Sequence, residues 1–354
     1  MHRILSVNPG STSTKIALYE DEKPVFIQNI EHTREELAPF TRIPDQLEYR
    51  KQLVRDTLES NGYQLDQLSA IVGRGGLVPN LKTGGYRVND QLATVLSGEE
   101  ISPHASNLGG LIAKSLADPL GIPAYIYDAV TSGELNEVAR ITGIPGVVRQ
   151  SMCHALNSRA MARKYAIAMG KKYEDMRILV AHLGGGTSVS AHENGKIIDS
   201  IGDDDGQFSP ERSGSVPLLS VIDMCYSGLY TKEEMVQKIR GKGGMFAHLG
   251  TSDCRIIEQR IQGGDEKAKV VFEAQAYQIA KGIGLLSITL KGQVDVIILT
   301  GGVAHSRLLT SLVEKYVSFI APVVVMPGEN EMEALANAGL RLLRGEETAR
   351  EYTR

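Results

Sequence analysis

The chain has no tryptophan, only six phenylalanines and only three cysteines among its 354 residues. The cysteines, Cys153, Cys225 and Cys254, are odd in number and lack the spacing of metal ligands, so neither structural disulfides nor a zinc site is expected. Long hydrophobic runs are also missing, since none approaches the ~20 residues that cross a bilayer. A strand is predicted directly after the first residues, which leaves no room for a signal peptide. We expect a cytoplasmic protein that is not held in a membrane.

An excess of positive charge is absent as well. Lysine and arginine together number 38, against 42 for aspartate and glutamate, and the formal net charge is −4. Binding to nucleic acid or anionic lipid through bulk charge is therefore not expected, although local cations can still bind a small anion. The hydrophobic content of 42% and the charged content of 23% are typical of a globular protein, and the length suits two domains.

What the sequence does have is a strand–turn–strand pattern that occurs twice. Residues 4–19 consist of an apolar strand, a turn rich in Gly, Ser and Thr, and a second strand, and residues 178–192 repeat this plan. In each half a third strand follows, at 24–30 and at 196–201, and helices then alternate with strands. Such a duplication constrains the architecture. We predict an α/β protein of two ribonuclease-H-like domains, by analogy, with the ligand bound in a cleft between them.

The predicted domain boundary lies near residue 150, just after residues 143–146, where two Gly and one Pro favour a turn. Residues 1–150 are expected to form the first domain and residues 151–330 the second. A last helix, within 331–354, is expected to pack back on the first domain. Further helices are predicted at 46–60, 106–120, 275–290 and 304–316.

Both turns have the composition of anion-binding loops. The first, NPGSTSTK at residues 8–15, exposes backbone N–H groups and hydroxyls and ends in a lysine. An ordinary β-hairpin is the alternative, because Asn, Pro, Gly and Ser are common in such turns. The second turn has three successive glycines, Gly184, Gly185 and Gly186, which cost conformational entropy and indicate close approach of a ligand to the backbone. Two such turns favour a nucleotide polyphosphate, although neither matches a P-loop.

Several charged or polar residues lie between the predicted helices and strands, at strand ends or beside Gly, Pro and other small residues. Asp128 follows a strand predicted up to residue 127, so it is a candidate magnesium ligand or base, with a helix N-cap as the alternative. Arg74 and Arg212 have small neighbours, which favours anion binding. His104 and His154 fit either a functional site or a hydrogen-bonded structural role.

Two loops predict a nucleoside pocket in the second half. Gly301 and Gly302 end a strand predicted at 294–300 and precede a helix, an arrangement that brings backbone close to a flat ligand such as adenosine. Residues 249–253, LGTSD, form a second loop of small residues in the same half. Each loop is a weak signal alone, and together with the two turns they favour nucleotide binding.

With these segments in place, the whole chain resembles the acetate kinase family, within the superfamily of actin, sugar kinases and heat-shock chaperone ATPases. The resemblance rests on segments in family order and with family spacing: VNPGSTSTK (7–15), AHLGGGTS (181–188), RSG (212–214), LTGGVA (299–304) and PGENE (327–331). It implies an actin-like ATPase fold and a kinase that transfers a phosphoryl group between ATP and a carboxylate, with Mg²⁺ as the cofactor. It also implies a homodimer or a higher homo-oligomer.

The resemblance further implies roles for individual residues. The phosphate-binding residues would be Asn8, Ser11, Ser13 and Lys15 in the first domain and His182, Gly184, Gly185 and Gly186 in the second. The residues that hold the acyl carboxylate or the phosphoryl group in transfer would be Arg74, His154 and Arg212. Magnesium would be held, directly or through water, by Asp128 and Glu331. Ribose and adenine would lie around Asp253, Gly301 and Gly302, and His104 falls on an active-site position.

Cys153 marks a departure from acetate kinases, which carry a bulky aromatic residue at this place before the histidine. A smaller side chain at the acyl end of the site leaves room for further methylene groups, each worth ~0.8 kcal/mol when buried. We therefore expect butyrate or a branched short-chain acid as the acceptor, with acetate or propionate as the alternative. Gly185 also differs, because acetate kinases carry an asparagine there.

Two other classes of protein remain as rivals. A kinase for a sugar hydroxyl would need a catalytic base, which would give Asp128 a different role. An ATP-switched structural or chaperone module of the actin type would need large insertions for polymer or peptide contacts, and this compact chain shows none.

Overall fold

A computed structural model describes residues 1–202 and 204–353 of the chain. The chain divides into two compact units, the first formed by Met1–Ser132 with Asn330–Arg354 and the second by Gly133–Glu329. The division thus lies before the boundary expected near residue 150. The physical reason is that the chain after Gly133 is hydrogen-bonded to a strand of the second unit, with Glu134 N donating to Ile197 O at 3.0 Å.

The first unit contains a seven-stranded sheet in the order β12-β5-β6-β4-β1-β2-β3. The strands β1 to β3 form an antiparallel meander, and β4 and β6 run parallel to β1. The strands are β1 (Arg3–Pro9), β2 (Ser13–Glu20), β3 (Lys23–Glu31), β4 (Ala70–Arg74), β5 (Gly85–Arg87), β6 (Ala124–Tyr127) and β12 (Arg350–Glu351).

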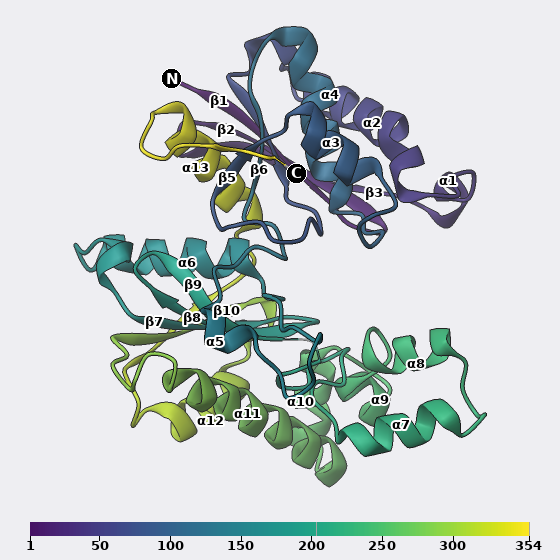
Figure 1. Ribbon diagram of the computed structural model, residues 1–354, viewed down its shortest axis with the longest axis vertical. Coiled ribbons are helices and arrows are strands. Elements are labelled where there is room, and N and C mark those ends of the chain that lie inside the picture. The colour runs from purple at the N-terminus through teal and green to yellow at the C-terminus, as the bar shows by residue number, and fades with distance from the viewer. Residues whose placement is uncertain (203, 354) are drawn as a thin grey trace. The chain divides into compact units, whose positions relative to one another are not determined.

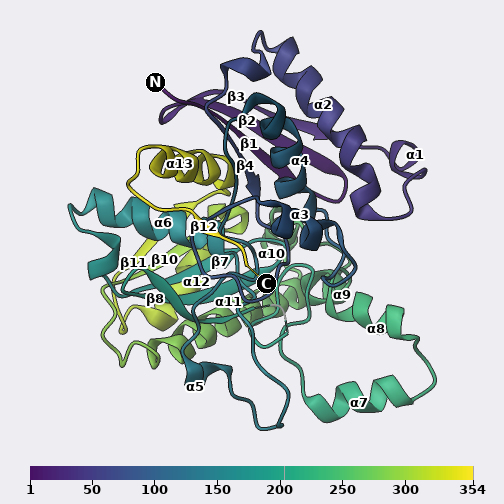
Figure 2. The same ribbon diagram turned by 45° about the horizontal axis from the view of Figure 1, so that its top comes forward.

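Helices cover both faces of this sheet because its central strands are apolar on both sides. Leu5 and Val7 belong to the core shared with α2 and α4, whereas the alternate residue Ile4 faces α13. Gly339 of α13 approaches Ile4 and Val72 so closely that a Cβ atom there would lie 2.6 Å from Val72 Cγ2. Figure 1 shows this C-terminal helix beside the N-terminal strands, and Figure 2 shows α2 and α4. The helices are α1 (Arg34–Leu37), α2 (Leu47–Ser60), α3 (Asp90–Ser97), α4 (Asn107–Ala117) and α13 (Glu331–Leu343).

The second unit contains a five-stranded sheet in the order β11-β10-β7-β8-β9. Here β7 to β9 form the antiparallel meander, and β10 and β11 run parallel to β7. The pairing of β7 with β8 and with β10, and of β8 with β9, repeats that of β1 with β2 and with β4, and of β2 with β3. The strands are β7 (Ile178–Leu183), β8 (Thr187–Glu193), β9 (Lys196–Ile201), β10 (Val296–Gly301) and β11 (Val323–Pro327). The expected duplication is therefore confirmed.

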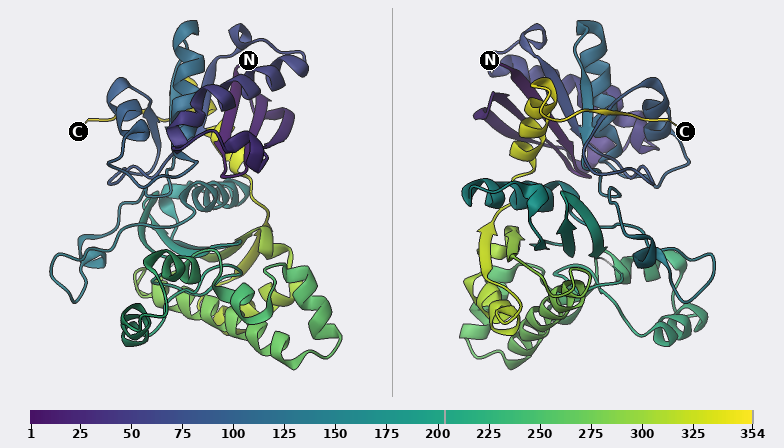
Figure 3. Two further views of the ribbon diagram at one scale, coloured as in Figure 1. Left: turned by 90° about the vertical axis from the view of Figure 1, so that its right-hand side faces the viewer. Right: turned by 60° about the vertical axis from the view of Figure 1, so that its left-hand side comes forward.

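The second sheet is also covered on both faces. Ile178 and Val180 of β7 pack with α6 (Ala155–Ala168), and the alternate residues Leu179 and Ala181 pack with α11 (Glu266–Ser287). Figure 3 shows the sheet of this unit between these helices. The other helices of the unit are α5 (Glu137–Arg140), α7 (Leu218–Tyr226), α8 (Lys232–Ile239), α9 (Gly244–Leu249), α10 (Cys254–Gln262) and α12 (Arg307–Val317).

Short 3-10 helices complete the secondary structure that matters for the site. The one that follows β10, Gly302–His305, is labelled η5 below. Within residues 1–202 and 204–353, no helix combines the length and the apolar character that crossing a membrane requires.

Candidate active site

The turn between β1 and β2 carries the phosphate-binding residues predicted for the first unit. Gly10 N donates to Ser13 O at 2.7 Å, which closes the turn. Asn8 lies opposite Lys15 in the antiparallel register, and Ser13 is two residues before Lys15, so these three residues share one face of the sheet. Ser11 is exposed at the tip of the turn. The four predicted residues therefore occupy one end of the β1–β2 ladder.

Arg74 joins two other predicted site residues at the end of β4. Its Nη1 lies 3.2 Å from Glu331 Oε2 and its Nη2 lies 3.2 Å from Glu331 Oε1, a two-pronged contact with one carboxylate. Asn8 Oδ1 accepts from Arg74 Nη1 at 3.4 Å, and Asn8 Nδ2 donates to Glu331 Oε2. Since Glu331 begins α13, three segments that are distant in sequence meet at this point.

Asp128 follows the last residue of β6 and adopts a backbone conformation that is unusual for a residue with a side chain. Its φ is +41°, in the region that glycine, asparagine and aspartate enter most readily. Its carboxylate Oδ1 accepts from Gly84 N at 2.7 Å, and the side chain is almost completely buried. A buried carboxylate at the carboxyl end of a parallel strand matches the predicted position.

His104 lies in the loop before α4, where it is exposed. Ser106 N donates to His104 Nδ1 at 3.2 Å, and Ser106 Oγ lies 2.7 Å from the same nitrogen. Because Nδ1 accepts from a backbone N–H, the proton of the neutral ring is on Nε2. His104 is thus held in one tautomer at the start of a helix in the first unit.

His154 and His182 form a stacked pair in the second unit. Their ring centroids are 3.9 Å apart and the ring planes differ by 7°. His154 caps the N-terminus of α6, and its backbone N–H and its Nδ1 are 3.2 Å and 2.8 Å from Ser188 Oγ.

Asn157 determines which nitrogen of His182 carries the proton. The amide Nδ2 of Asn157 donates to His182 Nδ1 at 2.9 Å and to Thr300 Oγ1 at 3.2 Å. An amide nitrogen has no acceptor capacity, so His182 Nδ1 must accept and the ring proton is on Nε2. That Nε2 faces Gly184, where a Cβ atom would lie 3.1 Å away. His182 therefore presents an N–H donor toward the glycine turn. Sequence reasoning did not single out Asn157, whose only signal was its place three residues after His154.

The glycine turn is anchored to the loop that carries Arg212. Gly185 O accepts from Ser209 Oγ at 2.6 Å and from Glu211 N at 3.2 Å. A Cβ atom on Gly186 would lie 2.6 Å from Arg212 Cζ, so the guanidinium occupies the space that any larger residue would need. The turn and Arg212 thus form one cluster in the second unit.

Gly301 holds the end of β10 against the end of β7. Its φ is +91°, and a Cβ atom there would lie 2.8 Å from Leu183 C and closer still to Leu183 O. Gly328 N donates to Gly301 O at 3.0 Å on the other side. Only glycine fits this position, because both the backbone conformation and the space exclude a side chain.

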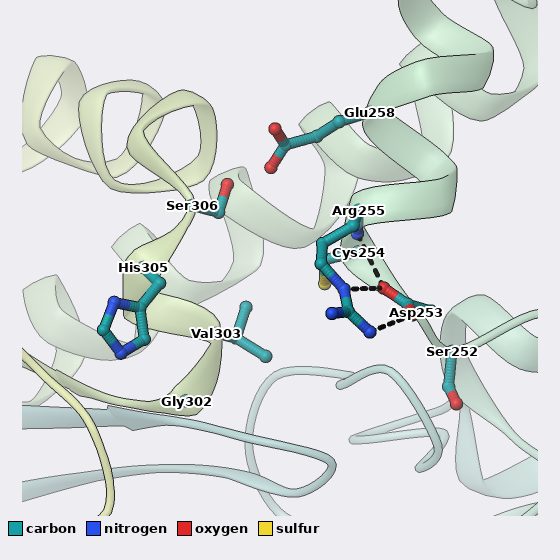
Figure 4. A pocket seen from close by; sticks show the side chains of 9 residues that line it. All are labelled: Ser252, Asp253, Cys254, Arg255, Glu258, Gly302, Val303, His305 and Ser306. Atoms are coloured by element: carbon teal, nitrogen blue, oxygen red, sulfur yellow. Dashed lines mark hydrogen bonds and ion pairs between the residues drawn. The ribbon is translucent and has the colours of Figure 1, made fainter.

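A pocket of about 630 Å³ lies beside Gly302 in the second unit. Figure 4 shows that its lining comes from two places, η5 with the start of α12 and the start of α10. The lining residues are Ser252, Asp253, Cys254, Arg255, Glu258, Gly302, Val303, His305 and Ser306. Its size and its position after a strand that ends in paired glycines fit the predicted nucleoside pocket.

Asp253 already has strong partners inside this pocket. Its Oδ1 accepts from Arg255 N at 2.9 Å, which caps α10, and its Oδ2 lies 2.7 Å from Arg255 Nη2. These hydrogen bonds from Arg255 lower the pKa of the Asp253 carboxyl to about 2. Burial raises the pKa of the neighbouring Cys254 thiol to about 12, so that side chain is neutral at physiological pH.

Cys153 lies in the core of the second unit. Its side chain clusters with Ala155 and Ile197, and its Sγ is 3.7 Å from Ser151 Oγ. The residue is 2% exposed. The thiol therefore fills space directly beside His154, the position at which the acyl end of the site was predicted.

Predicted metal ligands do not form a closed cage. Among the residues that the structure describes, no group of three or more His, Cys, Asp and Glu side chains is arranged to hold a metal ion. Asp128 and Glu331, both in the first unit, are the carboxylates that sequence analysis assigned to Mg²⁺.

Comparison with known proteins identifies the family. A model of the Acetokinase family matches residues 145–333. Butyrate kinase 1 of Clostridium acetobutylicum is 47% identical over 354 residues, which cover 99% of this chain and 100% of that protein. The chain belongs to the acetokinase family. A protein named probable butyrate kinase 2, from Caldanaerobacter subterraneus subsp. tengcongensis, is 49% identical to this chain over 99% of the chain and 100% of its own length.

The solved structure of an acetate kinase shares the fold of this chain. The crystal structure of the Porphyromonas gingivalis enzyme has a TM-score of 0.78 at 20% identity, over 97% of this chain and 100% of that chain. The expected actin-like ATPase fold of two duplicated α/β domains is therefore confirmed.

Gly301→Ala and Gly302→Ala compare a glycine that has no space for a side chain with its neighbour, which has space for one. We expect Gly301→Ala to lower the free energy of unfolding of the second unit by about 3 kcal/mol or more, because its Cβ would collide with the Leu183 backbone at a positive φ. Gly302→Ala should cost less than about 1 kcal/mol, since the nearest atom to its Cβ, Glu329 Oε1, is 4.0 Å away. Urea unfolding followed by circular dichroism measures both. Equal losses in the two variants would contradict this account.

Proposed function

We propose that this chain transfers the γ-phosphoryl group of ATP to the carboxylate of butyrate or of a branched short-chain acid, and catalyses the reverse reaction from the acyl phosphate and ADP. The observation that carries the proposal is the 47% and 49% identity, over 99% of the chain, to proteins named butyrate kinase 1 and probable butyrate kinase 2. Cys153 supports the choice of acid, because this thiol, which packs with Ala155 and Ile197, is smaller than the aromatic ring that acetate kinases carry before the histidine. Acetate or propionate is the alternative acceptor.

The chemistry calls for positioning and charge neutralisation rather than for a base. A carboxylate is already a nucleophile, so no proton has to be removed before it attacks phosphorus. Arg74, Arg212 and His154 are the groups that we assign to the oxygens of the acid and of the phosphoryl group in transfer. Donors that are fixed before the reaction stabilise the charge of the transition state without further reorganisation.

The second unit supplies the nucleotide site in this proposal. The Nε2–H of His182 and the backbone of Gly184 to Gly186 would bind the phosphates, because a fixed donor lies beside a turn that has no side chains and that is closed by Gly184 N donating to Gly186 O at 3.0 Å. The pocket beside Gly302 would take the nucleoside. Asp253 is paired with Arg255. It would therefore contact the ribose either while it keeps this ion pair or after the ribose replaces Arg255 as its partner.

Asp128 and Glu331 fit a magnesium ion that arrives with the nucleotide. Mg²⁺ keeps several waters and is bound through one or two carboxylates together with substrate phosphates, so a cage of three protein ligands is not needed. Asp128 is a buried carboxylate at a strand end, the donor chemistry that Mg²⁺ prefers. Both oxygens of Glu331 contact Arg74, which suits a role through water. The ion would neutralise phosphate charge when bound.

A comparison of acids tests the proposed function. Purified protein with MgATP is assayed with acetate, propionate, butyrate, isobutyrate and valerate, and the acyl phosphate is trapped as its hydroxamate. We expect kcat/KM to be highest for butyrate or isobutyrate and at least about tenfold lower for acetate. Hydroxamate formation that is absent with every acid, or ATP consumption that depends on a sugar, would contradict the proposal.

Gly186→Ala, with Gly284→Ala in α11 as a control outside the site, tests the assigned role of Arg212. The Cβ added at position 186 would displace the guanidinium, the free end of a flexible side chain, so the fold should survive while kcat/KM for butyrate falls about a hundredfold, as in Arg212→Ala and Arg74→Ala. The Cβ in Gly284→Ala would meet no atom within 4 Å, and activity should stay within about twofold of wild type. Near-normal turnover in Gly186→Ala and in both arginine variants would rule out the assignment.

We also propose that the chain forms a homo-oligomer through α7. This helix of nine residues is mostly apolar, and none of its residues is buried. Leu218 and Leu219 are each 76% exposed, and Tyr226 is 88% exposed. An isolated helix of this length is unstable in water, and a monomer seldom exposes so continuous an apolar surface. A second copy of the chain that covers α7 accounts for both features.

The double substitution Leu219→Asp and Ile222→Asp should convert the oligomer to a monomer, because buried carboxylates in an apolar interface cost more than the interface gains. Multi-angle light scattering measures the mass. Ile167→Asp, at an exposed apolar position of α6, is the control and should leave the mass unchanged. A wild-type protein that is monomeric, or a double variant that keeps the wild-type mass, would contradict the assignment.

The expected cytoplasmic location is likewise a proposal. Its support is chemical, since the three cysteines of the described residues are free thiols, as in a reducing compartment.

A further inference from the structure

Arg50 of α2 is buried although it carries a charge. Its side chain is 1% exposed and is among the largest that are fully buried in the described residues. The guanidinium lies under the β1–β2 turn, where Nη1 donates to Gly10 O at 2.8 Å and to Ser13 O at 3.0 Å. Nη2 donates to Ser11 O at 3.2 Å. Three carbonyl groups of one turn therefore converge on one guanidinium.

The remaining partners of Arg50 are neutral as well. Nη1 also donates to Thr14 Oγ1 at 3.0 Å, and Nε donates to Gln46 Oε1 at 3.0 Å. In the described part of the chain, no carboxylate forms an ion pair with this guanidinium. Burial lowers the pKa of Arg50 to about 10, which still leaves it protonated at physiological pH. A buried cation without a counter-ion is costly, so its retention needs a reason.

His32 completes the surroundings of Thr14 without adding charge. Its Nε2 lies 2.8 Å from Thr14 Oγ1, and its Nδ1 lies 3.4 Å from Tyr49 Oη. Burial, together with the neighbouring Arg50 charge, lowers the pKa of His32 to about 4. The ring is therefore neutral at physiological pH, and Arg50 is the source of positive charge beneath the turn.

The contacts of Arg50 also determine where the N–H groups of the turn point. In a planar trans peptide, the C=O of one residue and the N–H of the next lie on opposite edges. Because the carbonyls of Gly10 and Ser11 point inward to Arg50, the N–H groups of Ser11 and Thr12 point outward. Both residues are at the tip of the turn, and within the described chain neither N–H has a hydrogen-bond acceptor.

We infer that Arg50 is a positioning residue for phosphoryl transfer, which holds the β1–β2 turn with the Ser11 and Thr12 N–H groups presented to a phosphate and leaves an unneutralised positive charge beneath them. The inference rests on the proposed function, because it assigns this turn to the phosphoryl group. It extends that function to a residue that does not touch the substrate. In the turn of the second unit, the anchoring carbonyl Gly185 O accepts from the neutral donors Ser209 Oγ and Glu211 N.

Variants at Arg50 test the inference. Arg50→Met removes the charge and the fork of donors, and Arg50→Lys keeps the charge but not the fork. We expect kcat with butyrate to fall about thirtyfold or more in Arg50→Met and by a smaller factor in Arg50→Lys. The Kd for ADP, which the second unit binds in the proposal, should change by less than about twofold in both. Arg3→Met is the matched control, since Arg3 lies at the other end of β1 and pairs with Glu20 on the surface; its kcat should stay within about twofold of wild type.

A second measurement uses the unaltered protein and does not depend on whether the variants fold. Hydrogen–deuterium exchange of a peptide covering residues 8–15 is followed with and without inorganic phosphate and butyryl phosphate. Slower exchange at Ser11 and Thr12 in the presence of either anion is the expected result. Unchanged exchange, or folded Arg50→Met with kcat within about threefold of wild type, would overturn the inference. Wild-type protein without butyrate-dependent ADP formation would instead refute the proposed function, which separates the two failures.

Discussion

The close approach of Gly301 to the backbone of Leu183 is the constraint on which the second unit depends. It brings the ends of the parallel strands β10 and β7 together without an intervening side chain. The glycine turn leaves β7 at this point, and η5, with Gly302 at the edge of the pocket, leaves β10. A site that binds phosphates through main-chain N–H groups requires such proximity, because a single Cβ would move the donors out of reach.

The two units use the same strand–turn–strand plan with different chemistry. In the first, hydroxyl residues form the turn, and the buried guanidinium of Arg50 organises their carbonyl groups. In the second, bare glycine backbone forms the turn, and Asn157 holds His182 as a donor beside it. In the proposed function, the turn of the second unit binds the nucleotide and the turn of the first unit binds the phosphoryl group.

Sequence analysis predicted the duplication and most strands, because apolar runs followed by small-residue turns are strong local signals. The meeting of Asn8, Arg74 and Glu331 followed only from family resemblance, since Asn8 and Glu331 are 323 positions apart and no periodicity connects them. Arg50 was missed, although a charged residue on the apolar face of a predicted helix at 46–60 was a usable signal. The exposed helix α7 was not predicted. Apolar residues are typical of a buried core, and the sequence alone does not show what covers them.

The central claim is that the carboxylate oxygen of a short-chain acid attacks the γ-phosphorus of ATP directly. Butyrate labelled with heavy oxygen in its carboxylate tests it most directly. After turnover with MgATP, hydroxylamine releases phosphate from the acyl phosphate by attack at the acyl carbon, and mass spectrometry measures the label. The account predicts one heavy oxygen in each released phosphate, because the bridging oxygen comes from the acid. Unlabelled phosphate would contradict it, since the phosphoryl group would then have gone to water or to another acceptor.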